Sequence, residues 1–108
     1  MSYKVETTPN FEREARRLTK KYKSLKDEIR ALIECLEENP RQGMCLGENI
    51  YKIRLAVKSK GKGKRGGVRI MTQVKILNEV VYMFSIYSKG EKDDISDLEI
   101  QDLIQEIS

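Results

Sequence analysis

The sequence of 108 residues has no histidine, no tryptophan, two cysteines and two prolines. Without imidazole, a Ser-His-Asp triad, a Cys-His dyad and a histidine-ligated zinc site are all excluded. Cys35 and Cys45 have nine residues between them, which is not a CxxC spacing, and two cysteines are too few for a disulfide-stabilised secreted scaffold. The chain also lacks the apolar run of about 20 residues that spans a bilayer and an apolar leader after Met1. We therefore expect a cytoplasmic protein without a membrane contact, a metal or another cofactor.

The remaining composition is typical of one globular domain. Hydrophobic residues make up 39% of the chain and charged residues 35%. A chain of this length buries roughly 65% of its unfolded surface in a single core. We therefore expect residues 1–108 to form one domain, without a linker or an internal repeat.

The net charge of +4 is unevenly distributed along the chain. Residues 48–92 carry a net charge of +8, whereas residues 93–108 contain six acidic residues and no basic one. Residues 58–69 contain six cations and no acid. Because binding to a polyanion depends on local cation density, the middle of the chain is predicted to bind nucleic acid or another polyanion. The alternative is a merely solvated charged surface.

Apolar spacing predicts two helices near the N-terminus. The first residues alternate between apolar and polar side chains, which indicates a short strand. Thr8 followed by Pro9 is typical of the beginning of a helix. Apolar residues then recur every three or four positions as far as Leu36. Ser24 and the residues after it interrupt this pattern and resemble a capping box. We therefore expect two antiparallel helices, the second of which ends before Pro40.

The next segments alternate with a period of two and predict an antiparallel meander of strands at about residues 51–58, 68–76 and 80–87. In the first strand, apolar side chains face one side, and Lys52 and Arg54 face the other. In the third strand, we expect the even-numbered residues from Val80 to Ile86 to pack on the helices. The side chains predicted to meet on the opposite, open face of the sheet are Lys52, Arg54, Arg69 and Tyr87.

Helical spacing returns at residues 96–107, and Asp93, Asp94 and Asp97 precede or open this helix, where carboxylates complement its dipole. The glycine and the distal glutamate of a calcium loop are missing, so we expect no metal site here. The chain is thus predicted to have an α+β fold, with two N-terminal antiparallel helices packed on a small antiparallel sheet of three or four strands and a short C-terminal helix.

A glycine-rich cationic loop separates the first two strands of the meander. The run Gly61-Lys62-Gly63-Lys64-Arg65-Gly66 has the letters of a dinucleotide fingerprint, but a strand follows it where that motif needs a helix. We expect instead a hairpin loop whose glycines let lysines approach a phosphate chain. The candidate RNA-binding residues are Lys58, Lys60, Lys62, Lys64, Arg65 and Lys92.

Three segments together resemble one protein family. They are Ile50-Tyr51-Lys52-Ile53-Arg54-Leu55, the run from Lys60 through Gly66-Gly67-Val68-Arg69-Ile70, and Ile86-Tyr87-Ser88-Lys89. In combination they resemble the RelE/HigB-type toxins of bacterial toxin-antitoxin pairs, and the likeness extends over most of the chain.

The resemblance implies a RelE/ParE-like fold and an mRNA interferase that enters the ribosomal A site, cuts the codon there and thereby inhibits translation. It also implies an antitoxin protein, of the helix-turn-helix type or another, that holds the toxin inactive. Lys52, Arg54, Arg69 and Lys89 match basic positions of the family, and Tyr87 lies two residues before Lys89. Where the best-studied members carry an arginine after that lysine, this chain has Gly90, and their closing-segment tyrosine has no match here.

The chemistry of RNA cleavage assigns roles to these candidates. The internal 2′-OH must lose a proton, the phosphorane charge must be stabilised and the leaving 5′-oxygen must be protonated. Lys52 is the candidate base, since neighbouring cations favour loss of its proton, and Arg54 and Arg69 are candidates to clamp the phosphate oxygens. Lys89 or Tyr87 is the candidate proton donor or substrate-orienting group. Arg69→Ala is expected to abolish cleavage and leave the fold intact.

Two other functions fit the same sequence. One is a ParE-like toxin that binds and blocks DNA gyrase without catalysis, and the other is a small nucleic-acid-binding module without activity. The concentration of cations on the first two strands of the meander favours RNA.

Overall fold

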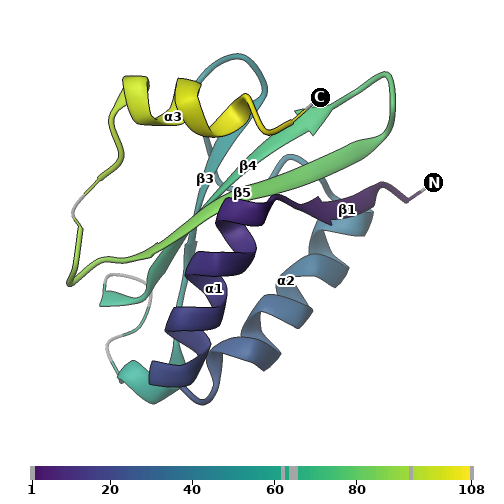
Figure 1. Ribbon diagram of the computed structural model, residues 1–108. Helices are drawn as coiled ribbons and strands as arrows, with labels where there is room; N and C mark the ends of the chain where they lie inside the picture. The colour runs from purple at the N-terminus through teal and green to yellow at the C-terminus, as the bar shows by residue number, and fades with distance from the viewer. Residues whose placement is uncertain (1, 62, 64–65, 93, 108) are drawn as a thin grey trace.

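The computed structural model describes residues 2–61, 63, 66–92 and 94–107 (Figure 1). In chain order, the elements are β1 (Lys4–Thr7), α1 (Pro9–Lys21), α2 (Leu25–Glu38), β2 (Met44–Cys45), β3 (Ile50–Leu55), a short 3-10 helix η1 (Lys58–Lys60), β4 (Val68–Lys75), β5 (Val80–Ser88) and α3 (Asp97–Ile104). The predicted α+β fold, with two N-terminal helices and a short closing helix, is confirmed.

The sheet has five strands in the order β1-β5-β4-β3-β2, one more than the largest number expected. The meander of β3, β4 and β5 is antiparallel, as predicted. However, β1 pairs parallel to β5, from Lys4 opposite Val80 to Thr7 opposite Met83, so the sheet is mixed. A parallel pair requires a long crossover, which α1 and α2 supply. The two-residue strand β2 is too short to show a period in the sequence.

Helices α1 and α2 lie side by side against one face of the sheet, and α3 lies on the other side (Figure 1). The side chain of Thr8 caps α1 by accepting a hydrogen bond from the Phe11 amide at 3.2 Å, and Pro9 occupies the first turn. At the start of α2, Ser24 makes no side-chain cap, contrary to the capping box expected there. Its hydroxyl instead bonds the Ser59 hydroxyl at 2.9 Å, and this contact ties η1 to the helices.

The larger core lies between these two helices and the sheet. Every second residue of β3 belongs to it, as the alternation predicted, and so do Val68, Ile70 and Val74 of β4. The buried members are Phe11, Leu18, Leu25, Leu32, Leu36, Tyr51, Ile53, Val57, Val68, Ile70, Val74, Val81, Met83 and Ile86. This core leaves Lys52 and Arg54 on the opposite face of β3.

A bulge changes which residues of β5 face the helices. Thr72 pairs with Met83 but Met71 pairs with Ser85, so Phe84 is an extra residue in β5. The helix-facing residues of β5 are Val81, Met83 and Ile86, and those facing α3 are Tyr82, Phe84 and Tyr87. The even-numbered pattern expected for this strand is therefore wrong at Tyr82 and Phe84, because the extra residue reverses the alternation partway along the strand.

Helix α1 supplies the hydrogen bonds that the bulge needs. Strand β1 ends before this point, so the edge of β5 has no strand partner there. Asn10 donates from its side-chain amide to the Phe84 carbonyl at 3.0 Å. The Glu14 carboxylate accepts from the Ser85 hydroxyl at 3.0 Å and from the Ile86 amide at 3.2 Å. Buried backbone groups at the bulge are thus satisfied by the first turns of α1.

A second, smaller cluster attaches α3 to the other face of the sheet. Its buried members are Ile50, Met71, Phe84, Tyr87, Ile95, Ile100 and Ile107. The closing segment consequently covers part of the face that was expected to be open. Among the described helices, none combines the length and the apolar character that crossing a membrane would require.

Candidate active site

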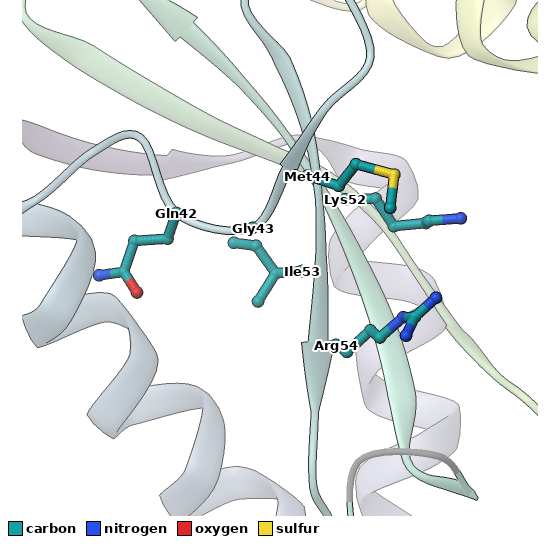
Figure 2. Close-up of a pocket in the computed structure, with 6 residues that line it drawn as sticks. All are labelled: Gln42, Gly43, Met44, Lys52, Ile53 and Arg54. Carbon is teal, nitrogen blue, oxygen red and sulfur yellow. The ribbon is translucent and has the colours of Figure 1, made fainter.

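Three predicted site residues form a row across β3, β4 and β5. Arg54 pairs with Arg69, and Arg69 pairs with Tyr87. Directly paired residues project from the same face of a sheet, so these three side chains are neighbours. Lys52 precedes Arg54 by two residues and shares that face; Figure 2 shows both side chains on one side of β3 and Ile53 on the other. The structure thus brings together four residues from three strands.

This face is more enclosed than the sequence indicated. Arg69 is only 5% exposed and Tyr87 only 3%. The Lys52 side chain is 15% exposed, so of the four residues only Arg54 is exposed. A ligand would therefore meet Arg54 first, with the other three groups behind it.

Arg69 is placed where its positive charge is costly. Burial, and then the neighbouring guanidinium of Arg54, lower the pKa of Arg69 below its ordinary value. One of its N–H groups contacts the Val68 carbonyl at 3.4 Å. Arg54 and Arg69 are directly paired across β3 and β4, so their positive charges are neighbours on a partly buried surface.

Asp94 is a member of the site that sequence reasoning placed elsewhere, at the start of the closing helix. One oxygen of its carboxylate lies 3.5 Å from the Lys52 ammonium and 3.5 Å from the Tyr87 hydroxyl. The same oxygen accepts the Ile95 amide at 2.9 Å; this bond, and then Lys52, lower the pKa of Asp94. The only sequence signal for this contact was the position of an acidic segment directly after a strongly basic one.

Lys92 also contacts the site, through Tyr87 and α3. Its ammonium lies 5.6 Å from the centre of the Tyr87 ring and pairs with the Glu99 carboxylate. Lys92, for which RNA binding stays a prediction, connects Tyr87 to α3 in the structure.

The remaining predicted cations fall into three groups. Lys89 directly follows β5 and is half-buried, and its amide donates to the Gly67 carbonyl at 3.2 Å. Lys58 is exposed on η1, whereas the Lys60 ammonium contacts Ser88 at 2.8 Å. The candidates that lie outside the described residues are Lys62, Lys64 and Arg65.

A hollow of about 340 Å³ lies beside the row, and Lys52 and Arg54 line it together with Gln42, Gly43, Met44 and Ile53 (Figure 2). Gly43 has a φ of +92°, and a Cβ there would stand 2.4 Å from the Lys52 carbonyl oxygen. Only glycine therefore allows the connection before β2 to pass so close to β3. The volume is within the range of small-ligand sites.

Tyr87 is expected to ionise only in strong alkali. Burial, and then the Asp94 carboxylate, raise the pKa of Tyr87 to about 12. Because an unfolded tyrosine ionises near pH 10, folding should favour the protonated phenol, and stability should fall as the pH rises from about 10 to about 12. Tyr87→Phe should lack this loss, which alkaline denaturation of both proteins will measure. Identical pH dependence in the two proteins would contradict the placement of Tyr87.

Comparisons with known proteins agree with this architecture. The family model described as "RelE toxin of RelE / RelB toxin-antitoxin system" matches residues 3–108. No curated protein matches the chain in sequence. Among solved structures, the free-state structure of an E. coli RelE toxin carrying two arginine-to-alanine mutations is 19% identical, with a TM-score of 0.68 and 100% of each chain covered. The isolated E. coli RelE toxin is 18% identical, with a TM-score of 0.62 and coverage of 96% of this chain and 98% of that one. The solved structures share the fold, and the match to the family model over nearly the whole length shows that the chain belongs to the RelE toxin family.

Proposed function

We propose that this toxin is a ribosome-dependent endoribonuclease that cuts mRNA in the A site by attack of the RNA's own 2′-OH, without a catalytic metal ion. The observation that carries the proposal is the row of Arg54, Arg69 and Tyr87 with Lys52 beside it, which gathers three cations and a phenol on one face. Such a set of preorganised donors suits a phosphate whose negative charge increases in the transition state.

The reaction follows from the RNA itself. The 2′-oxygen gives its proton to a general base and attacks the adjacent phosphorus, and the bond from phosphorus to the 5′-oxygen breaks. The products are a 2′,3′-cyclic phosphate and a 5′-hydroxyl, the latter formed when the leaving oxygen gains a proton. The protein has to orient the backbone, stabilise the phosphorane charge and move these two protons.

Arg54 and Arg69 are proposed to hold the non-bridging phosphate oxygens, because the guanidinium fork matches that geometry and keeps its charge. Tyr87 is proposed as the proton donor, since burial, together with Asp94, raises its pKa to about 12 and keeps it protonated. Lys89, directly after β5, is assigned to orienting the substrate.

Lys52 was the candidate base on the sequence, but its position supports a different role. Its partner is the Asp94 carboxylate at 3.5 Å, and an opposite charge stabilises an ammonium ion. We therefore assign Lys52 to phosphate binding. The phosphate would take the place that the Asp94 oxygen holds between Lys52 and Tyr87.

The cognate antitoxin is proposed to neutralise the cations of this face with an acidic segment. Complementary charge speeds and orients such association. The exposed guanidinium of Arg54 is the first group that such a segment would meet.

The test is to add the purified chain to a translation reaction and map cleavage by primer extension. Codon-dependent cuts that require the ribosome, with 2′,3′-cyclic phosphate ends, are expected. Arrest of DNA gyrase without mRNA cuts would replace the proposal with the ParE-like function, and neither effect would leave a binding module. Metal-independence is tested with a phosphorothioate at the scissile phosphate, whose cleavage should not be rescued by thiophilic metal ions.

Replacing Asp94 with asparagine is expected to tighten substrate binding. The change removes the competing negative charge, while the side-chain oxygen can still accept the Ile95 amide. Because ion pairs near the protein surface contribute about 0.2–1 kcal/mol, KM should fall by about 1.4- to fivefold. Asp102→Asn, the same change at an exposed position of α3, is the control. Loss of cleavage in Asp94→Asn with normal substrate binding would show that this carboxylate acts as the base.

A further inference from the structure

Lys60 was predicted to bind RNA, yet its ammonium group is engaged inside the protein. It donates to the Ser88 hydroxyl at 2.8 Å and contacts the Gly67 carbonyl at 3.4 Å. It also lies 5.1 Å from the centre of the Tyr22 ring, within the range of a cation–π contact. Two of its N–H donors are thus used in hydrogen bonds, and its charge also contacts the aromatic ring.

These contacts join segments that carry the proposed active site. Gly67 directly precedes β4, the strand that holds Arg69. Ser88 is the last residue of β5 and separates Tyr87 from Lys89 in the sequence. The Gly67 carbonyl also accepts a hydrogen bond from the Lys89 amide at 3.2 Å. This one oxygen therefore contacts both the Lys60 ammonium and the backbone directly after β5.

The backbone around Gly67 and Ser88 is closely packed. A Cβ on Gly67 would stand 2.0 Å from the Leu55 carbonyl oxygen, so the start of β4 is pressed against the end of β3. On the other side, the Glu91 amide donates to the Ser88 carbonyl at 3.0 Å, and the Glu91 carboxylate pairs with Arg17 of α1 at 2.9 Å. The end of β5 is therefore fixed to α1 as well as to Lys60.

We propose that Lys60 is a positioning residue of the cleavage reaction, which holds the ends of β4 and β5 together and thereby sets the positions of Arg69 and Lys89. It does this from behind the site and does not touch the RNA. Lys58, two residues earlier, is exposed, and we assign RNA binding to it. The inference rests on the proposed function and adds to it that Lys60 positions the site whereas Lys58 binds RNA.

The experiment compares Lys60→Met and Lys58→Met in ribosome-dependent cleavage at several salt concentrations. Loss of one phosphate contact should lower the slope of log affinity against log salt by about 1. Lys58→Met should show this lower slope and a raised KM. Lys60→Met should keep the wild-type slope and lower kcat by about 10- to 100-fold, the cost of misplacing reacting groups. Lys26→Met, an exposed lysine of α2, should behave as wild type.

A second readout tests the contact itself. Burial raises the pKa of Tyr22, whereas a hydrogen bond with Ser88, and then the ammonium groups of Lys60 and Lys21, lower it. The lowering effects together are larger, so the pKa lies below its ordinary value. Lys60→Met and Ser88→Ala should each raise it, as measured by NMR titration of carbon-13-labelled tyrosine. Lys60→Arg keeps the charge and should recover most of the lost kcat, and it supplies the comparison if Lys60→Met does not fold.

Opposite results would separate the two proposals. A lower salt slope and an unchanged kcat in Lys60→Met, or an unchanged titration of Tyr22, would overturn the positioning role while leaving the proposed function intact. Absence of any cleavage by the wild-type chain would instead overturn the proposed function.

Discussion

Replacing Arg69 with methionine is expected to lower the single-turnover rate of mRNA cleavage by about 100- to 1000-fold, the cost of removing one preorganised charged donor from an active site. Arg69 lies at the centre of the row, between Arg54 on β3 and Tyr87 on β5. It is only 5% exposed, so water screens its charge little. Because the side chain is buried, methionine is a better replacement than alanine, since it fills much of the same space.

The matched comparison for Arg69 is lysine, which keeps the positive charge but loses the planar fork that binds two phosphate oxygens at once. Arg69→Lys should therefore fall between wild type and Arg69→Met. Circular dichroism and the thermal midpoint check that each variant is folded. A cleavage rate for folded Arg69→Met within about threefold of wild type would remove Arg69 from the transition state.

The part of the site that the sequence predicted is the part set by alternation within single strands. On β3, Lys52 and Arg54 project from one face of the sheet, and Tyr51 and Ile53 project from the other, as a half-buried strand requires. Arg69 follows the same rule on β4. Since β3 and β4 form an antiparallel pair, the two rows meet once the register aligns Arg54 with Arg69.

The parts that alternation could not predict depend on contacts between distant segments. The bulge at Phe84 is held by Asn10 and Glu14, more than 70 positions away in the chain, and no local pattern indicates it. The contact of Asp94 with Lys52 depends on how α3 packs against the sheet. In the sequence, nothing distinguishes Lys60 from the neighbouring lysines. Its contact with Ser88 exists only because the fold brings the two segments together.

Strand β5 contributes to both cores, and this makes Phe84 a test of how the closing segment is held. Phe84 is fully buried in the smaller cluster with Ile100 and Ile107, whereas its neighbour Met83 is fully buried in the helix-side core. Removing a large buried side chain costs about 2–5 kcal/mol of unfolding free energy. Phe84→Ala and Met83→Ala should therefore both be destabilising, but in different parts of the fold.

Phe84→Ala is expected to lower the free energy of unfolding by about 3–5 kcal/mol and to speed hydrogen exchange of the α3 amides, such as the one that Ile100 donates to Ser96. Met83→Ala should instead speed exchange in α1, which packs on the other face. Because α3 begins three residues after Asp94, loosening it should free Lys52 and Tyr87 from their carboxylate partner. The KM of Phe84→Ala should then fall in the same direction as that of Asp94→Asn. Equal exchange of the α3 amides in wild type and Phe84→Ala would show that the smaller cluster does not hold the closing helix against the site.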